Sequence, residues 1–207
     1  VPHGHLDEDK SFLRTDAPTV SVEVLRLLLS LAAEYDWRVG SSDIKAAYLQ
    51  ASGFNREIFV RPPKEEADSV HLWQFDKPAY GLGDSGRLWF LTSFRALVAH
   101  NYNHVPMTKL FQIKASDLFV TTQVDNFIFT DTDKAMNEFS AYMGKCFQLS
   151  ELEYDNFTVY GTVFGRDEAG IHINQRAKVL ELMEFHLSSE RRRMHDEPVT
   201  RAERLFY

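Results

Sequence analysis

One short hairpin constrains the fold of this chain more than any other segment. Two β-rich runs, 118–124 and 127–130, flank a two-residue Asp125-Asn126 step. Asp and Asn tolerate the positive φ angles of tight hairpin turns, so this step predicts two antiparallel strands joined by an acidic tip. Taken alone, such a step is typical of an ordinary turn, and a functional interpretation needs support from elsewhere in the chain.

A second acidic strand end lies upstream of the hairpin. Residues 37–43 predict a strand that ends on Asp43. Carboxylates at two neighbouring strand ends can hold Mg²⁺ ions, which prefer oxygen ligands and activate the attacking and leaving oxygens of phosphoryl transfer. Asp43 and Asp125 are therefore the candidate catalytic residues and metal ligands, and Asn126, directly after Asp125, is a third candidate.

Four motifs in one order resemble the reverse transcriptase of copia-type retrotransposons, an RNA-dependent DNA polymerase. They are Asp-Ile-Lys-Ala-Ala-Tyr-Leu-Gln at 43–50, Glu-Ile-Phe-Val-Arg-Pro-Pro at 57–63, Pro-Ala-Tyr-Gly-Leu-Gly-Asp-Ser-Gly-Arg-Leu-Trp at 78–89, and Val-Asp at 124–125. The resemblance covers roughly residues 14–207. It implies a polymerase that uses Mg²⁺ as its cofactor if it is active.

The resemblance also implies nucleotide-binding residues. Tyr48 resembles the family's steric gate against the 2′-hydroxyl of a ribonucleotide; without the resemblance it is a core tyrosine on a short helical turn. The segment beginning at Gly81 and including Arg87 resembles a Gly-Leu-x-x-x-Pro-Arg-x-Trp pattern that supports template and nucleotide. Gly86 stands at the Pro position, so we expect a less preorganised loop. Arg87 and Trp89 fit either nucleic-acid contacts or ordinary cap and core residues.

Several departures from the family predict impaired catalysis. The family's hairpin carries two adjacent Asp residues, whereas Asn126 keeps a carbonyl oxygen and lacks the negative charge. A loss on the order of 3–5 kcal/mol at the transition state slows the reaction by roughly a hundred to several thousand fold. Gln123 replaces the family's aromatic or His, and we expect neither the basic fingers segment nor the thumb in this chain.

Composition limits the number of domains, the compartment and the kinds of partner that we expect for this chain. The 207 residues are 44% hydrophobic with net charge −7, which fits one globular domain and disfavours a general phosphate-binding surface. The single Cys146 excludes an internal disulfide and a Cys-rich zinc site, and suits an intracellular reducing compartment. The longest apolar run, 27–33, is too short to span a bilayer and no secretory signal is visible, so we expect no membrane partner.

The predicted fold class is α+β. We expect a polymerase palm, with a ferredoxin-like antiparallel sheet from 37–43, 118–124 and 127–130 and helices near 21–35 and 132–146 packed on one face. A small fingers-like part adds strands at 57–61 and 70–75. The expected divisions are an irregular lead-in at 1–18, a fingers/palm domain at 19–186 and a polar extension at 187–207.

Three functional interpretations remain open. The first is a reverse-transcriptase-like domain that has lost catalysis and serves as a structural or interaction subunit of a larger assembly. The second is an active RNA-directed DNA polymerase fragment, and the third is a non-catalytic nucleic-acid-binding module. We expect other protein chains as partners, docked on 187–207 and on the strands around Phe59 and Trp73, while any RNA or DNA is met by Arg191 to Arg193.

Overall fold

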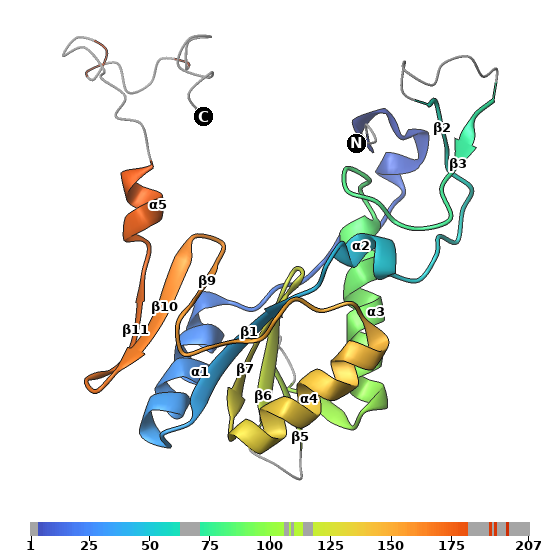
Figure 1. Ribbon diagram of the computed structural model, residues 1–207. Coiled ribbons are helices and arrows are strands. Elements are labelled where there is room, and N and C mark those ends of the chain that lie inside the picture. Colours follow the sequence, from blue (N-terminus) through green and yellow to red (C-terminus); the bar gives the residue numbers. More distant parts are fainter. Residues whose placement is uncertain are drawn as a thin grey trace.

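The computed structural model describes residues 4–62, 71–105, 108, 110–113, 118–181, 191, 193 and 198. Its centre is a six-stranded antiparallel sheet in the order β4-β5-β6-β7-β1-β8 (Figure 1). The strands are β1 Arg38–Asp43, β4 Tyr102–His104, β5 Leu110–Ile113, β6 Phe119–Gln123, β7 Asn126–Asp131 and β8 Glu153–Tyr154. The predicted α+β class with an antiparallel sheet is confirmed.

Two of the five helices in the described residues, α1 Val22–Glu34 and α4 Asp133–Cys146, match the helices predicted near 21–35 and 132–146. The other three are α2 Ala47–Gln50, α3 Ser85–Ala99 and α5 Arg176–Leu180, and the 3-10 turns η1 Gly4–Leu6 and η2 Glu8–Ser11 precede α1. Helix α1 begins after Ser21, whose side-chain oxygen accepts the Val24 N–H at 3.3 Å. In the described part of the chain, no helix is long and apolar enough to cross a membrane.

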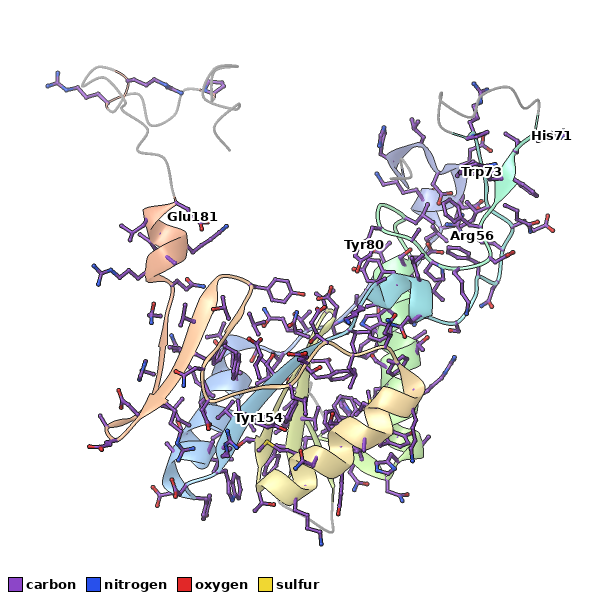
Figure 2. All side chains as sticks on the ribbon, in the orientation of Figure 1. Arg56, His71, Trp73, Tyr80, Tyr154 and Glu181 are labelled. Atoms are coloured by element: carbon purple, nitrogen blue, oxygen red, sulfur yellow. The ribbon has the colours of Figure 1, made fainter. Side chains whose placement is uncertain are left out.

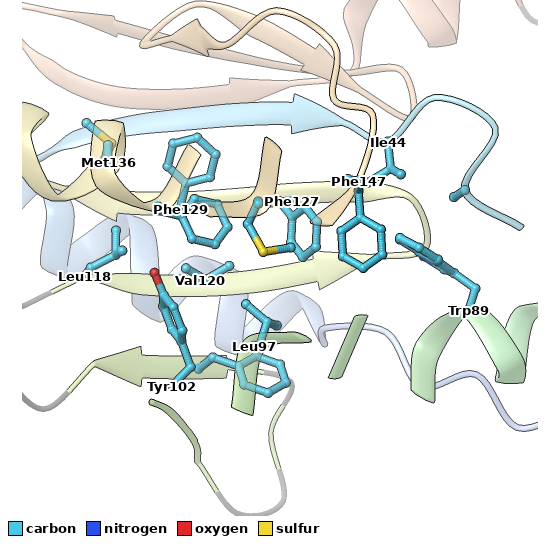
Figure 3. Packing of buried hydrophobic residues seen from close by; sticks show 14 of the residues in the cluster. Ile44, Trp89, Leu97, Tyr102, Leu118, Val120, Phe127, Phe129, Met136 and Phe147 are labelled. Carbon is cyan, nitrogen blue, oxygen red and sulfur yellow. The ribbon is translucent and has the colours of Figure 1, made fainter. Parts of the chain in front are cut away.

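The two amphipathic helices lie on opposite faces of the sheet, so the prediction of one shared face is wrong. Successive side chains of a strand point to opposite faces. Phe127 and Phe129 of β7 belong to one core cluster, while Ile128 between them belongs to another. Their helix partners are divided in the same way: Met136, Phe139 and Met143 of α4 join the first cluster (Figure 3), and Leu29 and Ala32 of α1 join the second.

A second sheet extends the α1 face. It has the order β11-β10-β9, with β9 Phe157–Val159, β10 Thr162–Asp167 and β11 Gly170–Asn174. Phe157, Val159 and Phe164 are buried in the same cluster as Leu29 and Ala32 of α1. β10 and β11 pair antiparallel, from Val163 opposite Asn174 to Asp167 opposite Gly170. The shared core holds the β9–β10 turn in a defined position relative to α1 and the main sheet.

The N-terminal residues pack on the folded chain. The sequence predicts an irregular segment here, and the structure contains η1 and η2 within it. The Arg56 guanidinium donates to the Asp7 and Asp84 carboxylates, with its shortest contact 2.7 Å from Asp7 Oδ2. The Gly4 N–H also donates to the Gly81 carbonyl at 3.0 Å. These contacts join the N-terminus to the start of α3 and to the small β2–β3 pair, Phe59–Val60 and Trp73–Gln74.

Candidate functional site: an acidic pair at two strand ends

The hairpin turn lies one residue earlier than predicted. Gln123 and Asn126 form the last pair between β6 and β7, so the two-residue loop is Val124-Asp125 and Asn126 begins β7. Val124 has a φ of 56°, which is unusual for a β-branched residue. The buried Trp89 indole donates its N–H to the Val124 carbonyl at 2.7 Å. This contact from α3 supports a turn that the local sequence does not favour.

The structure brings Asp43 and Asp125 together, as the sequence predicts. Asp43 lies opposite Asn126 in the β1–β7 register, and the Ile44 N–H donates to the Asp125 carbonyl at 2.9 Å. Burial raises the pKa of the Asp43 carboxyl, and the negative charge of Asp125 raises it further, partly offset by the Ile44 N–H. The two carboxylates therefore interact electrostatically at the end of the sheet.

Asn126 acts as a hydrogen-bond donor to this pair. Its Nδ2 donates to Asp125 Oδ1 at 3.2 Å. An Asp at this position would add a negative charge where the amide now supplies a neutral donor. The Asn126 amide therefore adds no charge to the site and occupies one acceptor position of Asp125 Oδ1.

Two tyrosine rings pack against each other beside the acidic pair. Tyr48 of α2 is half-buried, and its ring centroid lies 4.4 Å from that of Tyr80 at an interplanar angle of 31°. Burial raises the pKa of both hydroxyls, with a further contribution from the Asp125 charge. Tyr80, labelled in Figure 2, was not predicted as a site residue, although it directly precedes Gly81 in the sequence.

The other two predicted nucleotide contacts are engaged within the protein. Gly81, at φ 99°, uses its carbonyl to accept the Gly4 N–H. Arg87 forms an ion pair with Asp16, which also pairs with Arg14 at 3.1 Å. Gly86 lies in the first turn of α3. The structure thus places only Tyr48, among the three predicted contacts, beside the acidic pair.

Tyr160 is a site residue that sequence reasoning missed. It lies in the β9–β10 turn, and its hydroxyl donates to Asp125 Oδ1 at 2.5 Å, while the Gln123 carbonyl oxygen lies 3.1 Å from the same hydroxyl oxygen. Burial and the bond to Asp125 raise the pKa of this hydroxyl well above its usual value. The Tyr-Gly dipeptide between two β runs indicates a turn, but no local signal connects that turn with Asp125.

A small cavity adjoins the site. Its volume is about 50 Å³, and Tyr48, Gly86, Trp89 and Val124 are among the residues that line it. A water molecule needs roughly 10–15 Å³ of such space, whereas small-molecule pockets measure about 300–1,000 Å³. The cavity is therefore large enough for water and too small for a nucleotide, which would have to bind at the open surface beside the tyrosines.

The donor set suits one divalent cation better than two. Asp43 and Asp125 supply two carboxylates, and Asp125 Oδ1 already accepts bonds from Asn126 and Tyr160. Within the described ranges, no group of three or more His, Cys, Asp or Glu side chains could hold a metal ion. Two carboxylates and an amide offset the charge of two Mg²⁺ ions less well than three carboxylates would.

Asp43→Asn should raise the melting temperature at pH 7. The folded-state pKa of Asp43 is raised, so the folded protein binds this proton more tightly than the unfolded chain, and ionisation of Asp43 destabilises the fold. This gain in melting temperature should shrink as the pH is lowered from above the raised pKa of Asp43 to below the ordinary pKa of an Asp side chain. Glu57→Gln, at an exposed carboxylate, controls for the loss of one charge. A gain that does not depend on pH would contradict this assignment.

Comparison with known proteins places the chain among transposon sequences. A family described as reverse transcriptase (RNA-dependent DNA polymerase) matches residues 4–191. The Retrovirus-related Pol polyproteins from transposons RE2 and RE1 of Arabidopsis thaliana are 23% and 22% identical over 83% of this chain. The polyprotein from transposon TNT 1-94 of Nicotiana tabacum is 33% identical over 42% of the chain and 6% of its own length. The chain spans 12% of the length of the two Arabidopsis relatives.

Proposed function

Because the chain belongs to the reverse transcriptase (RNA-dependent DNA polymerase) family of copia-type retrotransposons, we propose that its polymerase chemistry is impaired. In this proposal the domain serves as a structural or interaction subunit of a larger assembly. Its sheet corresponds to the polymerase palm, and the β2–β3 pair with the N-terminal turns corresponds to a fingers-like part.

The Asn126 amide carries this proposal. It donates to Asp125 at 3.2 Å at the position where the resemblance implies a second acidic residue. Mg²⁺, when bound, activates the attacking and leaving oxygens of phosphoryl transfer. Asp43 and Asp125 are the residues that would hold it, and the amide beside them cannot add the third negative charge.

Calorimetric titration with Mg²⁺ and with Mn²⁺ tests the impairment. We expect at most one weak site in the unmodified chain, and no site after Asp125→Ala, because the remaining carboxylate is a poor ligand on its own. Two tight sites that disappear together in Asp125→Ala would contradict the proposal.

An active polymerase fragment is the second candidate. The observation that favours it is the contacting pair of rings Tyr48 and Tyr80, which lies beside Asp43 and Asp125 and offers a surface for an incoming nucleotide. A general nucleic-acid-binding role has less support, because Arg56 and Arg87 are paired with carboxylates. Arg191 donates to the Pro198 carbonyl at 3.1 Å, and Arg192 lies outside the described residues.

Other protein chains are the partners that we propose. Phe59, Leu72 and Trp73 on and beside the β2–β3 pair are 52%, 56% and 44% exposed, and large apolar groups on a surface often mark partner contacts. Figure 2 labels Trp73 on β3. The curated relatives are polyproteins of which the chain spans a small part. Of the predicted docking segment 187–207, only residues 191, 193 and 198 are described.

Replacing Trp73 with a photo-crosslinking amino acid tests this surface in the larger assembly that is proposed to contain the chain. We expect crosslinks to protein, and few from the same group at the exposed Ser30 on α1. Crosslinks to RNA from position 73 would favour the nucleic-acid-binding interpretation, and equal crosslinking from both positions would remove the support for a docking surface.

A further inference from the structure

The β9–β10 turn reaches across to the acidic hairpin. Tyr160 and Gly161 form the two-residue connection between Val159 and Thr162, which are paired in the ladder. From this turn the Tyr160 hydroxyl donates to Asp125 Oδ1, and the Gln123 carbonyl oxygen lies 3.1 Å from the same hydroxyl oxygen. One side chain of the smaller sheet therefore contacts both the carboxylate and the backbone of the β6–β7 hairpin.

Asp125 Oδ1 has both of its acceptor positions in use. A carboxylate oxygen carries two lone pairs, and Oδ1 accepts one bond from Tyr160 and one from Asn126 Nδ2. Both donors are neutral groups, and together they occupy one of the two carboxylate oxygens. A cation that binds both Asp125 oxygens must first displace a donor.

The backbone at this contact is held in uncommon conformations. Tyr160 and Gly161 have φ angles of 50° and 74°, and Val124 in the facing hairpin has 56°. Bulky residues adopt positive φ rarely, and such conformations persist where the surrounding structure stabilises them. Here Phe157, Val159 and Phe164 anchor the turn in the buried cluster on α1, and Trp89 supports the Val124 carbonyl.

We propose that Tyr160 is an internal ligand of Asp125 that competes with a divalent cation for this carboxylate. Tyr160 is a positioning residue, and the β9–β10 turn sets the cation affinity of the acidic pair. The inference rests on the proposed function in taking Asp43 and Asp125 as the cation ligands. The proposed function attributes the weak cation affinity to Asn126 alone. This inference attributes part of that low affinity to Tyr160, which lies on a separate segment of the chain.

Mn²⁺ titration of the Tyr160→Phe variant tests the proposal. Loss of the hydroxyl frees one acceptor position on Asp125, and hydrogen bonds to charged groups are the stronger ones, so Mn²⁺ affinity should rise on the order of tenfold. Tyr35→Phe is the matched control. Tyr35 is 61% exposed and lies before the first residue of β1, whereas Asp43 is the last residue of that strand. When Asp125 is already replaced by Ala, Tyr160→Phe should not change the Mn²⁺ affinity.

The outcomes separate this inference from the proposed function. An unchanged Mn²⁺ affinity in a folded Tyr160→Phe variant, or the same gain in Tyr35→Phe, overturns the role of Tyr160 and leaves the weak-site proposal intact. Two tight sites in the unmodified chain would instead overturn the proposed function. Thermal melting verifies folding, and Tyr160→Leu repeats the test if the Phe variant does not fold.

Discussion

Asn126→Asp should raise templated primer extension by this chain by roughly a hundred to several thousand fold, the range that about 3–5 kcal/mol at the transition state represents. The change removes the Nδ2 donor from Asp125 and supplies a third carboxylate beside Asp43 and Asp125. Extension of a labelled primer on an RNA template, with Mg²⁺ present, measures the rates of the unmodified and reverted chains.

Asp125→Ala in the reverted background is the control for this experiment, and it should abolish any gain because it removes a proposed metal ligand. Robust synthesis by the unmodified chain would refute the impaired-catalysis proposal. Activity only after reversion would identify Asn126 as the cause of the impairment. No synthesis by either chain would favour a purely structural role.

Phe129→Ala should lower the free energy of unfolding by about 3–5 kcal/mol, with a fall in melting temperature of roughly 6–20 °C for a chain of this size. Phe129 is fully buried on β7, and its ring centroid lies 5.1 Å from that of Phe139 on α4 (Figure 3). Truncation leaves a cavity between the sheet and α4 that close-packed neighbours fill only in part. Urea denaturation measures the loss.

Phe59→Ala makes the same chemical change at a residue that is 52% exposed, and should alter the free energy of unfolding by no more than about 0.5 kcal/mol. A similar loss in both variants would contradict the packing assigned to Phe129.

Gly40→Ala tests the other side of the Phe129 contact. A Cβ at Gly40 would overlap the Phe129 ring, so the variant should lose about 1–3 kcal/mol. Most of this loss should disappear in the Phe129→Ala background, because the obstructing ring is gone. Gly144→Ala, in α4 with open space around its Cβ, should be neutral or stabilising.

Several features were determined by the sequence through interactions between near neighbours. Periodic apolar residues predicted α1 and α4 to within about one residue, and alternating β-rich runs predicted the strands that end at Asp43 and flank the hairpin. The pairing of Asp43 with Asp125 came instead from the order of the family's motifs, because local propensity does not show that strands this far apart in sequence pair. The motif order indicated the family, which the comparisons confirmed.

Other features were decided only by contacts between distant segments. An amphipathic stripe shows that a helix must bury one side, but α1 and α4 carry no local record of which sheet face they cover. The Trp89 bond supports the turn at Val124, Asp16 pairs with Arg87, and the β9–β10 turn brings Tyr160 to Asp125. Each contact joins residues more than 30 positions apart in sequence, as the 35 positions between Trp89 and Val124 illustrate. Short-range propensity carries no information about such pairs, so only tertiary packing selects them.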